Sequence, residues 1–99
     1  FGGEIENLKN VYHGVETGIK IVNHKKLFLD IPKNIVVGRY HSWVVKHPLP
    51  SCLIATSFDN NGYLMSLRHK NYNVSGVQFH PESILTKCGK KILQNWLND

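Results

Sequence analysis

The chain has 99 residues, of which 41% are hydrophobic and 19% charged, as is typical of a single globular domain. Its eight glycines and four prolines, together with the lack of heptads or short repeats, exclude collagen, coiled-coil and low-complexity classes. Its uninterrupted apolar runs reach about four residues, whereas a membrane-spanning helix needs roughly 18. We therefore expect no membrane partner.

Twelve Lys and Arg residues against seven Asp and Glu residues give a formal charge of +5. The basic residues are dispersed along the sequence with no run of five or more, which favours a solvated basic surface over a nucleic-acid site. Cys52 and Cys88 form neither a disulfide framework nor a metal-binding pair, and no signal-peptide pattern opens the sequence. A cytoplasmic location is expected.

The first part of the sequence predicts short extended segments. Glu4–Leu8 alternates polar and apolar residues like an edge strand, whereas Tyr12–Gly18 is punctuated by glycines and is expected to be a loop. Ile19–Val22 is a β-prone run. The apolar segment Leu27–Ile31 ends at a turn that begins with Pro32.

The middle of the sequence predicts further strands. Ile35–Val37 and His41–Val45 are expected to be two extended pieces with a bend between them, because a glycine interrupts the run. Leu53–Phe58 and Tyr63–His69 flank Asp59–Gly62, whose Asn-Gly pair tolerates positive φ at both turn positions. These two segments therefore predict a β-hairpin.

The last part predicts one more strand and a helix. Val74–Phe79 is β-prone, and the following His-Pro-Glu ends the strand because proline has no N–H to give to a sheet. Thr86 is the predicted N-cap of a C-terminal helix. The apolar stripe of this helix would comprise Leu85, Cys88, Ile92, Leu93, Trp96 and Leu97. Taken alone, the pattern is β-rich with one helix.

His80-Pro81-Glu82 is the most suggestive polar group. Six histidines invite a metal site, but the sequence has no HxH, HExxH or paired-cysteine spacing, so no metal is expected. The proline forces a turn that lets the Glu82 carboxylate fold back on the His80 ring. Such a carboxylate fixes the imidazole tautomer and leaves the other ring nitrogen as a base. From these residues alone, a catalytic pair and an ordinary surface turn both remain open.

The residues around this pair are more specific. Gly76–Thr86, which reads GVQFHPESILT, is followed by Gly89 and a closing helix, and it resembles the C-terminal signature of class I glutamine amidotransferases. Arg39–Val45, which reads RYHSWVV, His13-Gly14 and Ser66–Lys70 resemble further blocks of this family. The resemblance covers nearly the whole chain. Within the family, the sequence most resembles the glutaminase components of anthranilate synthase and aminodeoxychorismate synthase.

This resemblance implies an α/β fold. Residues 1–99 would form the C-terminal part of one open-sheet amidotransferase domain, rich in short strands with a β-hairpin and a C-terminal helix, and without a cofactor. His80 would be the general base and acid of a Cys–His–Glu triad, and Glu82 the carboxylate that orients it. Ser42 and Trp43 match positions whose backbone lies against bound glutamine, although both could simply be strand residues; Trp43 replaces the common leucine.

The nucleophile of such a triad is not evident in this sequence. Cys52 and Cys88 lack the glycine-flanked strand-to-helix turn and are expected to be small buried hydrophobes. The resemblance implies that an N-terminal portion of the same domain supplies the cysteine, so the chain by itself is expected to be inactive.

The function implied is hydrolysis of L-glutamine to glutamate and ammonia, with ammonia passing to a synthase subunit that uses chorismate. Two alternatives stay open. One is a degenerate or non-catalytic β-rich binding module. The other is a different class I amidotransferase, such as that of GMP synthetase.

Overall fold

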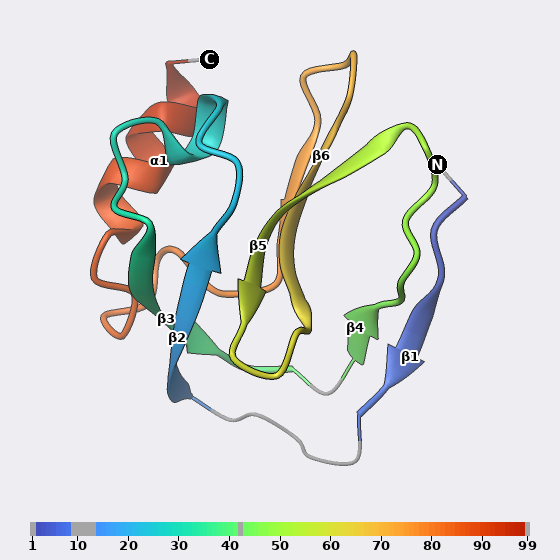
Figure 1. Cartoon of the computed structure of the whole chain (residues 1–99). Helices are drawn as coiled ribbons and strands as arrows, with labels where there is room; N and C mark the ends of the chain where they lie inside the picture. The colour runs from blue at the N-terminus through green and yellow to red at the C-terminus, as the bar shows by residue number, and fades with distance from the viewer. Residues whose placement is uncertain (1, 9–13, 42, 99) are drawn as a thin grey trace.

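The computed structural model describes residues 2–8, 14–41 and 43–98. Short strands dominate the described part of the chain, and a single α-helix closes it (Figure 1). The elements are β1 (Ile5–Asn7), β2 (Val15–Ile21), the 3-10 helix η1 (Lys26–Phe28), β3 (Asn34–Arg39), β4 (Trp43–Val45), β5 (Leu53–Asp59), β6 (Leu64–His69), β7 (Ser75–Val77) and α1 (Gly89–Leu97). The predicted β-rich chain with one C-terminal helix is confirmed.

The strands form two antiparallel sheets. Five of them pair in the order β3-β2-β5-β6-β7, and β1 pairs with β4 in a separate two-stranded sheet. In Figure 1, α1 and η1 lie together beside β2 and β3, while the β1–β4 pair lies on the far side of the β5–β6 hairpin. The predicted edge strand at Glu4–Leu8 is confirmed as β1.

The predicted loop at Tyr12–Gly18 is wrong from Val15 onward. β2 begins at Val15 and pairs with β3 from Val15 opposite Arg39 to Lys20 opposite Asn34. Gly18 sits within this ladder opposite Val36. The β-rich partner strand supplies the pairing that the glycine-punctuated sequence of β2 does not itself favour. Residues 12 and 13 lie outside the described part.

The hairpin is confirmed, but its turn differs from the expected form. Among the described turn residues 59–62, Gly62 alone has a positive φ, at 83°. The Gly62 N–H donates to the Asp59 carbonyl at 3.2 Å, and the Asp59 N–H donates to the Tyr63 carbonyl at 3.0 Å. This is a three-residue loop closed by a left-handed glycine, which is the common alternative to the two-residue turn.

The bend expected between the two middle strands lies later than the glycine that suggested it. β3 runs through Gly38 to Arg39, and β4 begins at Trp43, so two strands are present with shifted bounds. The strand expected at Val74–Phe79 is shorter, covering Ser75–Val77 as β7.

The helix begins at Gly89, three residues after the expected cap. Thr86 makes no capping bond and instead contacts β3. Of the apolar stripe, Ile92 is buried, whereas Trp96 and Leu97 are 62% and 73% exposed. The helix is held at η1 by the Asn95 amide, which donates to the carbonyls of Leu27 and Leu29 at 2.9 Å each.

The core lies between the five-stranded sheet and the pair formed by α1 and η1. Phe28 of η1 and Phe79 after β7 face each other with ring centroids 6.4 Å apart. The buried cluster comprises Ile19, Ile21, Phe28, Ile31, Ile35, Val37, Met65, Phe79 and Ile92. Burial of these side chains, each worth roughly 1.5–3 kcal/mol, fixes the sheet against the helix.

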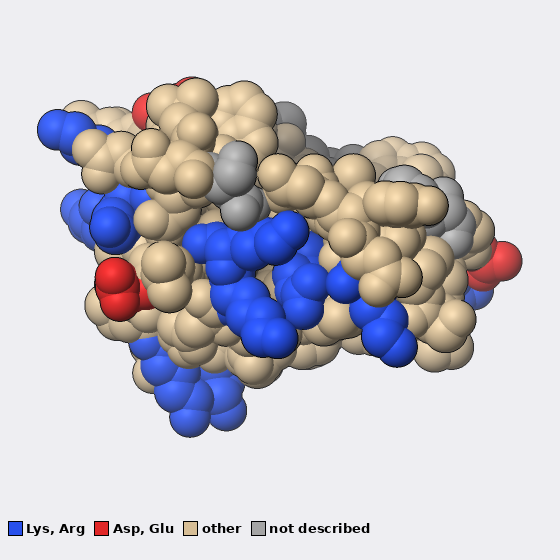
Figure 2. All heavy atoms as spheres, turned by 90° about the horizontal axis from the view of Figure 1, so that it is seen from above, with Lys and Arg blue, Asp and Glu red and all other residues tan. Residues whose placement is uncertain are grey.

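Lys and Arg side chains gather near the centre of one face. Figure 2, viewed from above relative to Figure 1, shows this group and smaller basic groups at the margins, with few acidic residues between them. Residues that are dispersed in the sequence are thus brought together by the fold. Within the described ranges, no helix has the length and apolar character needed to span a membrane.

Candidate active site

His80 and Glu82 meet at the turn that follows β7. His80 Nδ1 lies 3.2 Å from Glu82 Oε1, so the carboxylate folds back on the ring as the sequence predicts. The two side chains are 49% and 64% exposed. A polar contact this exposed adds little to stability. The same exposure leaves the ring open to a reacting group.

The backbone of this turn is fastened to β3 at Gly38. The His80 N–H donates to the Gly38 carbonyl at 3.0 Å, and the Gly38 N–H donates to Thr86 Oγ1 at 2.9 Å. The Thr86 hydroxyl in turn donates to the His80 carbonyl at 2.6 Å. Further along, the Lys87 N–H donates to the Val36 carbonyl at 3.2 Å. Residues 80–87 therefore occupy the outer edge of β3.

Two glycines permit this close approach. A Cβ at Gly38 would lie 2.9 Å from Ser83 Oγ and 3.0 Å from Leu85 Cβ. A Cβ at Gly89 would overlap the Pro81 carbonyl oxygen. The sequence signal for this packing is that Pro81, Thr86 and Gly89 fall within the block that resembles the amidotransferase signature, because helix-capping rules alone do not reveal it.

Tyr40 packs directly on the histidine. The Tyr40 and His80 ring centroids are 4.8 Å apart at an interplanar angle of 76°, an edge-to-face contact. The Tyr40 hydroxyl lies 3.3 Å from Ser83 Oγ. Tyr40, His80, Glu82, Ser83 and Ile84 line an open depression of about 520 Å³. Its described lining contains no cysteine.

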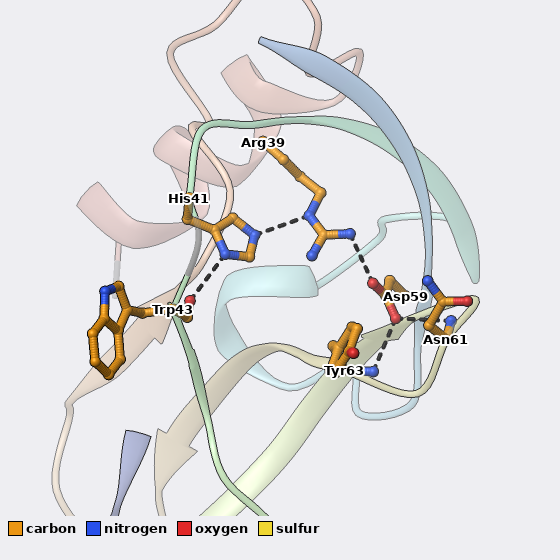
Figure 3. Close-up of polar contacts among 6 residues, drawn as sticks. All are labelled: Arg39, His41, Trp43, Asp59, Asn61 and Tyr63. Atoms are coloured by element: carbon orange, nitrogen blue, oxygen red, sulfur yellow. Dashed lines mark hydrogen bonds and ion pairs between the residues drawn. The ribbon is translucent and has the colours of Figure 1, made fainter. Parts of the chain in front are cut away.

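A second polar group joins the hairpin turn to the segment between β3 and β4 (Figure 3). Arg39 Nη1 lies 2.7 Å from Asp59 Oδ2, and the side chains are 1% and 2% exposed. Arg39 Nε donates to His41 Nε2 at 2.9 Å, and His41 Nδ1 lies 2.9 Å from the Trp43 carbonyl oxygen. The Trp43 carbonyl, at a position expected to contact glutamine, is thus linked through the His41 ring to the buried ion pair.

The protonation of His41 follows from these partners. A guanidinium can only donate, so Nε2 accepts and Nδ1 carries the proton that reaches Trp43. Burial lowers the pKa of His41 below its ordinary value, the bond to Trp43 opposes this, and the Arg39 charge adds to the lowering. The charge of His80 also lowers this pKa, so the two imidazoles interact electrostatically.

The other predicted site residues are placed differently. Ser42 lies outside the described residues. Trp43 is the first residue of β4, paired with Asn7 and 49% exposed. Cys52 and Cys88 are partly buried rather than fully buried, and Cys88 packs against the core. Among the described residues, no three His, Cys, Asp or Glu side chains form a group that could hold a metal ion.

Comparison with known proteins identifies the family. The family described as glutamine amidotransferase class-I matches residues 1–99. The chain belongs to the class I glutamine amidotransferases. It is 44% identical to anthranilate synthase component 2 of Pseudomonas aeruginosa, over 98% of this chain and 51% of that protein. It is 39% identical to the aminodeoxychorismate/anthranilate synthase component 2 of Bacillus subtilis, over 98% of this chain and 50% of that protein.

The fold of this amidotransferase sequence is also found in solved structures. A protein of Thermoplasma acidophilum assigned to GMP synthase superimposes with a TM-score of 0.90 at 23% identity, covering 99% of this chain and 48% of that one. The chain spans about half the length of the component 2 relatives that it matches. The predicted family and its strand-rich α/β fold are therefore confirmed for this portion.

Proposed function

We propose that this chain is part of a glutaminase that hydrolyses L-glutamine and feeds the ammonia to a chorismate-using synthase. The observation that carries the proposal is the His80–Glu82 pair at 3.2 Å, set on a turn beside an open depression. Family membership and the relatedness to component 2 proteins support the same activity.

The chemistry assigns a separate task to each residue. His80 takes the proton from a cysteine thiol, and the thiolate attacks the carboxamide carbon of glutamine. His80 then returns the proton to the leaving ammonia and activates the water that hydrolyses the glutamyl thioester. Glu82, on Nδ1, orients the ring and stabilises its charged form, which leaves Nε2 to move protons.

The cysteine of this triad is assigned to residues beyond this sequence. Cys52 lies just before β5 and Cys88 precedes α1, and neither lines the depression beside His80 among the described residues. We infer that residues 1–99 are the C-terminal portion of one amidotransferase domain, and that an N-terminal portion completes the site. Because the relatives are about twice as long, they have room for such a portion.

The substrate site and partner follow from the same assignment. Ser42 and Trp43 are proposed to place backbone groups against the bound glutamine. The partner is proposed to be a synthase subunit that aminates chorismate, either to anthranilate or to aminodeoxychorismate.

The test uses the complete protein that contains this sequence, assayed for glutamate release with its synthase partner. His80→Ala should lower kcat by about 10²–10⁴, because the proton-transfer group is lost. Glu82→Gln should lower kcat by a smaller factor, since the base remains and only its orientation weakens. His24→Ala, which removes a histidine in the loop after β2, should leave kcat unchanged. Full activity in His80→Ala would refute the proposal.

A further inference from the structure

The carboxylate of Asp59 serves two elements at once. Its Oδ1 accepts the N–H groups of Asn61 and Tyr63 at 2.9 Å each, which orders the hairpin turn. Its Oδ2 binds Arg39 at 2.7 Å in a nearly fully buried pair. Because the turn fixes the carboxylate, the guanidinium at the end of β3 is fixed as well. The position of Arg39 is thus set by a turn 20 residues away in sequence.

His41 transmits this position to the backbone. The rigid guanidinium presents Nε–H to His41 Nε2, which leaves only the Nδ1–H tautomer for the neutral ring. That N–H is directed at the Trp43 carbonyl. Figure 3 shows the continuous path from the hairpin turn through Arg39 and His41 to Trp43.

β4, which receives this bond, is held otherwise by its pairing with β1 and by the buried Val44. β4 is three residues long, and its partner β1 is exposed throughout. A two-stranded pair of this kind is weak by itself. The neighbouring Tyr40 contacts a different group, because its ring packs on His80. Two neighbouring residues before β4 thus make contacts in two directions. Tyr40 packs on His80, and His41 binds Arg39 of the buried ion pair.

We propose that Asp59, Arg39 and His41 form a positioning relay for the glutamine-binding backbone at Trp43. This inference rests on the proposed glutaminase function and deepens it by adding residues that act on substrate binding. None of the three touches the reacting atoms, so they are positioning residues and not catalytic ones. Burial and the Arg39 charge lower the pKa of His41, the bond to Trp43 and the Asp59 carboxylate act in the opposite direction, and the net lowering favours the neutral ring whose Nε2 accepts from Arg39.

The kinetic test separates positioning from chemistry. In the complete protein, His41→Ala should raise the KM for glutamine about tenfold while kcat changes less than about twofold, because a substrate contact present in both ground and transition states is weakened. His41→Asn keeps an N–H near the place of Nδ1, so its KM should lie close to the wild-type value. His47→Ala is the matched control, since His47 is an exposed histidine stacked on Phe58 outside the relay, and its KM should stay unchanged.

A second measurement needs no variant. Nitrogen NMR of the His41 ring in the complete protein should show Nδ1 protonated and Nε2 unprotonated at about pH 7.5, well above the ordinary histidine pKa. The opposite tautomer, or an unchanged KM in His41→Ala, would overturn the relay while glutaminase activity persists. A wild-type protein without glutaminase activity would instead refute the proposed function, and the tautomer would still test the hydrogen-bond path.

Discussion

At the scale of single residues, the turn that carries His80 depends on groups that are not themselves reactive. Thr86 joins the Gly38 N–H to the His80 carbonyl with one hydroxyl, and Gly38 and Gly89 leave room for the turn to approach. Removing an acceptor from a buried N–H costs its full desolvation, which exceeds the net gain of an ordinary hydrogen bond. These bonds fix the backbone of the turn, and the Tyr40 ring and the Glu82 carboxylate then contact the His80 imidazole.

Thr86→Val tests this role. The substitution keeps the shape but leaves the buried Gly38 N–H without its acceptor, so the free energy of unfolding should fall by about 1–3 kcal/mol, measured by urea denaturation of the complete protein. Thr86→Ser retains the hydroxyl, so its free energy of unfolding should fall much less. Equal stability of the valine variant and the wild type would contradict the role assigned to this hydroxyl.

Part of this arrangement can be predicted from the sequence. Glu82 can be placed on the His80 ring because the proline between them forces a local turn. Thr86 is predicted to cap the helix because a capping role is visible locally, whereas its actual partner, Gly38, is 48 residues away. The Asp59–Arg39–His41 path escapes prediction for the same reason. Local patterns define turns and strands, but a buried polar path depends on which strands become neighbours.

At the scale of elements, the β5–β6 hairpin both forms the sheet centre and fixes the relay. Its turn needs a left-handed residue at Gly62 and an acceptor at Asp59. The hairpin could be predicted because Asp59–Gly62 separates two β-prone runs. The form of its turn could not, because Asn-Gly suits both the two-residue turn and the three-residue loop observed.

Gly62→Ala should lower the free energy of unfolding by about 1–2 kcal/mol, because a Cβ is strained at a φ of 83°. Gly18→Ala is the matched control, because Gly18 lies in β2 and an added Cβ there would have nothing within 4 Å. That variant should be neutral or slightly more stable. Urea denaturation of both variants checks the comparison, and equal destabilisation would show that the turn is not the cause.

At the scale of the whole molecule, the apolar surface is only partly covered. Trp96 and Leu97 of α1 are largely exposed, and Ile84 beside His80 is 93% exposed. Leu27, Val77, Ile92 and Trp96 also line an apolar groove between α1 and β7. Such surface in a small domain favours association with other protein surfaces.

Residues 1–99 expressed alone should therefore self-associate, and light scattering after size-exclusion chromatography measures this association. Trp96→Gln should reduce the association of the isolated chain, because it removes the largest exposed apolar side chain of α1. A monodisperse isolated chain that unfolds cooperatively would instead support the independent binding module.

The segment at residues 80–87 also stands where another strand could add to β3. Main-chain donors and acceptors at a bare sheet edge recruit strands from other molecules. The histidine turn binds the Val36 carbonyl and both the N–H and the carbonyl of Gly38, and so covers this part of the edge against pairing with a foreign strand. A change that loosened this turn would therefore expose the edge of β3 and displace His80, the proposed base, at the same time.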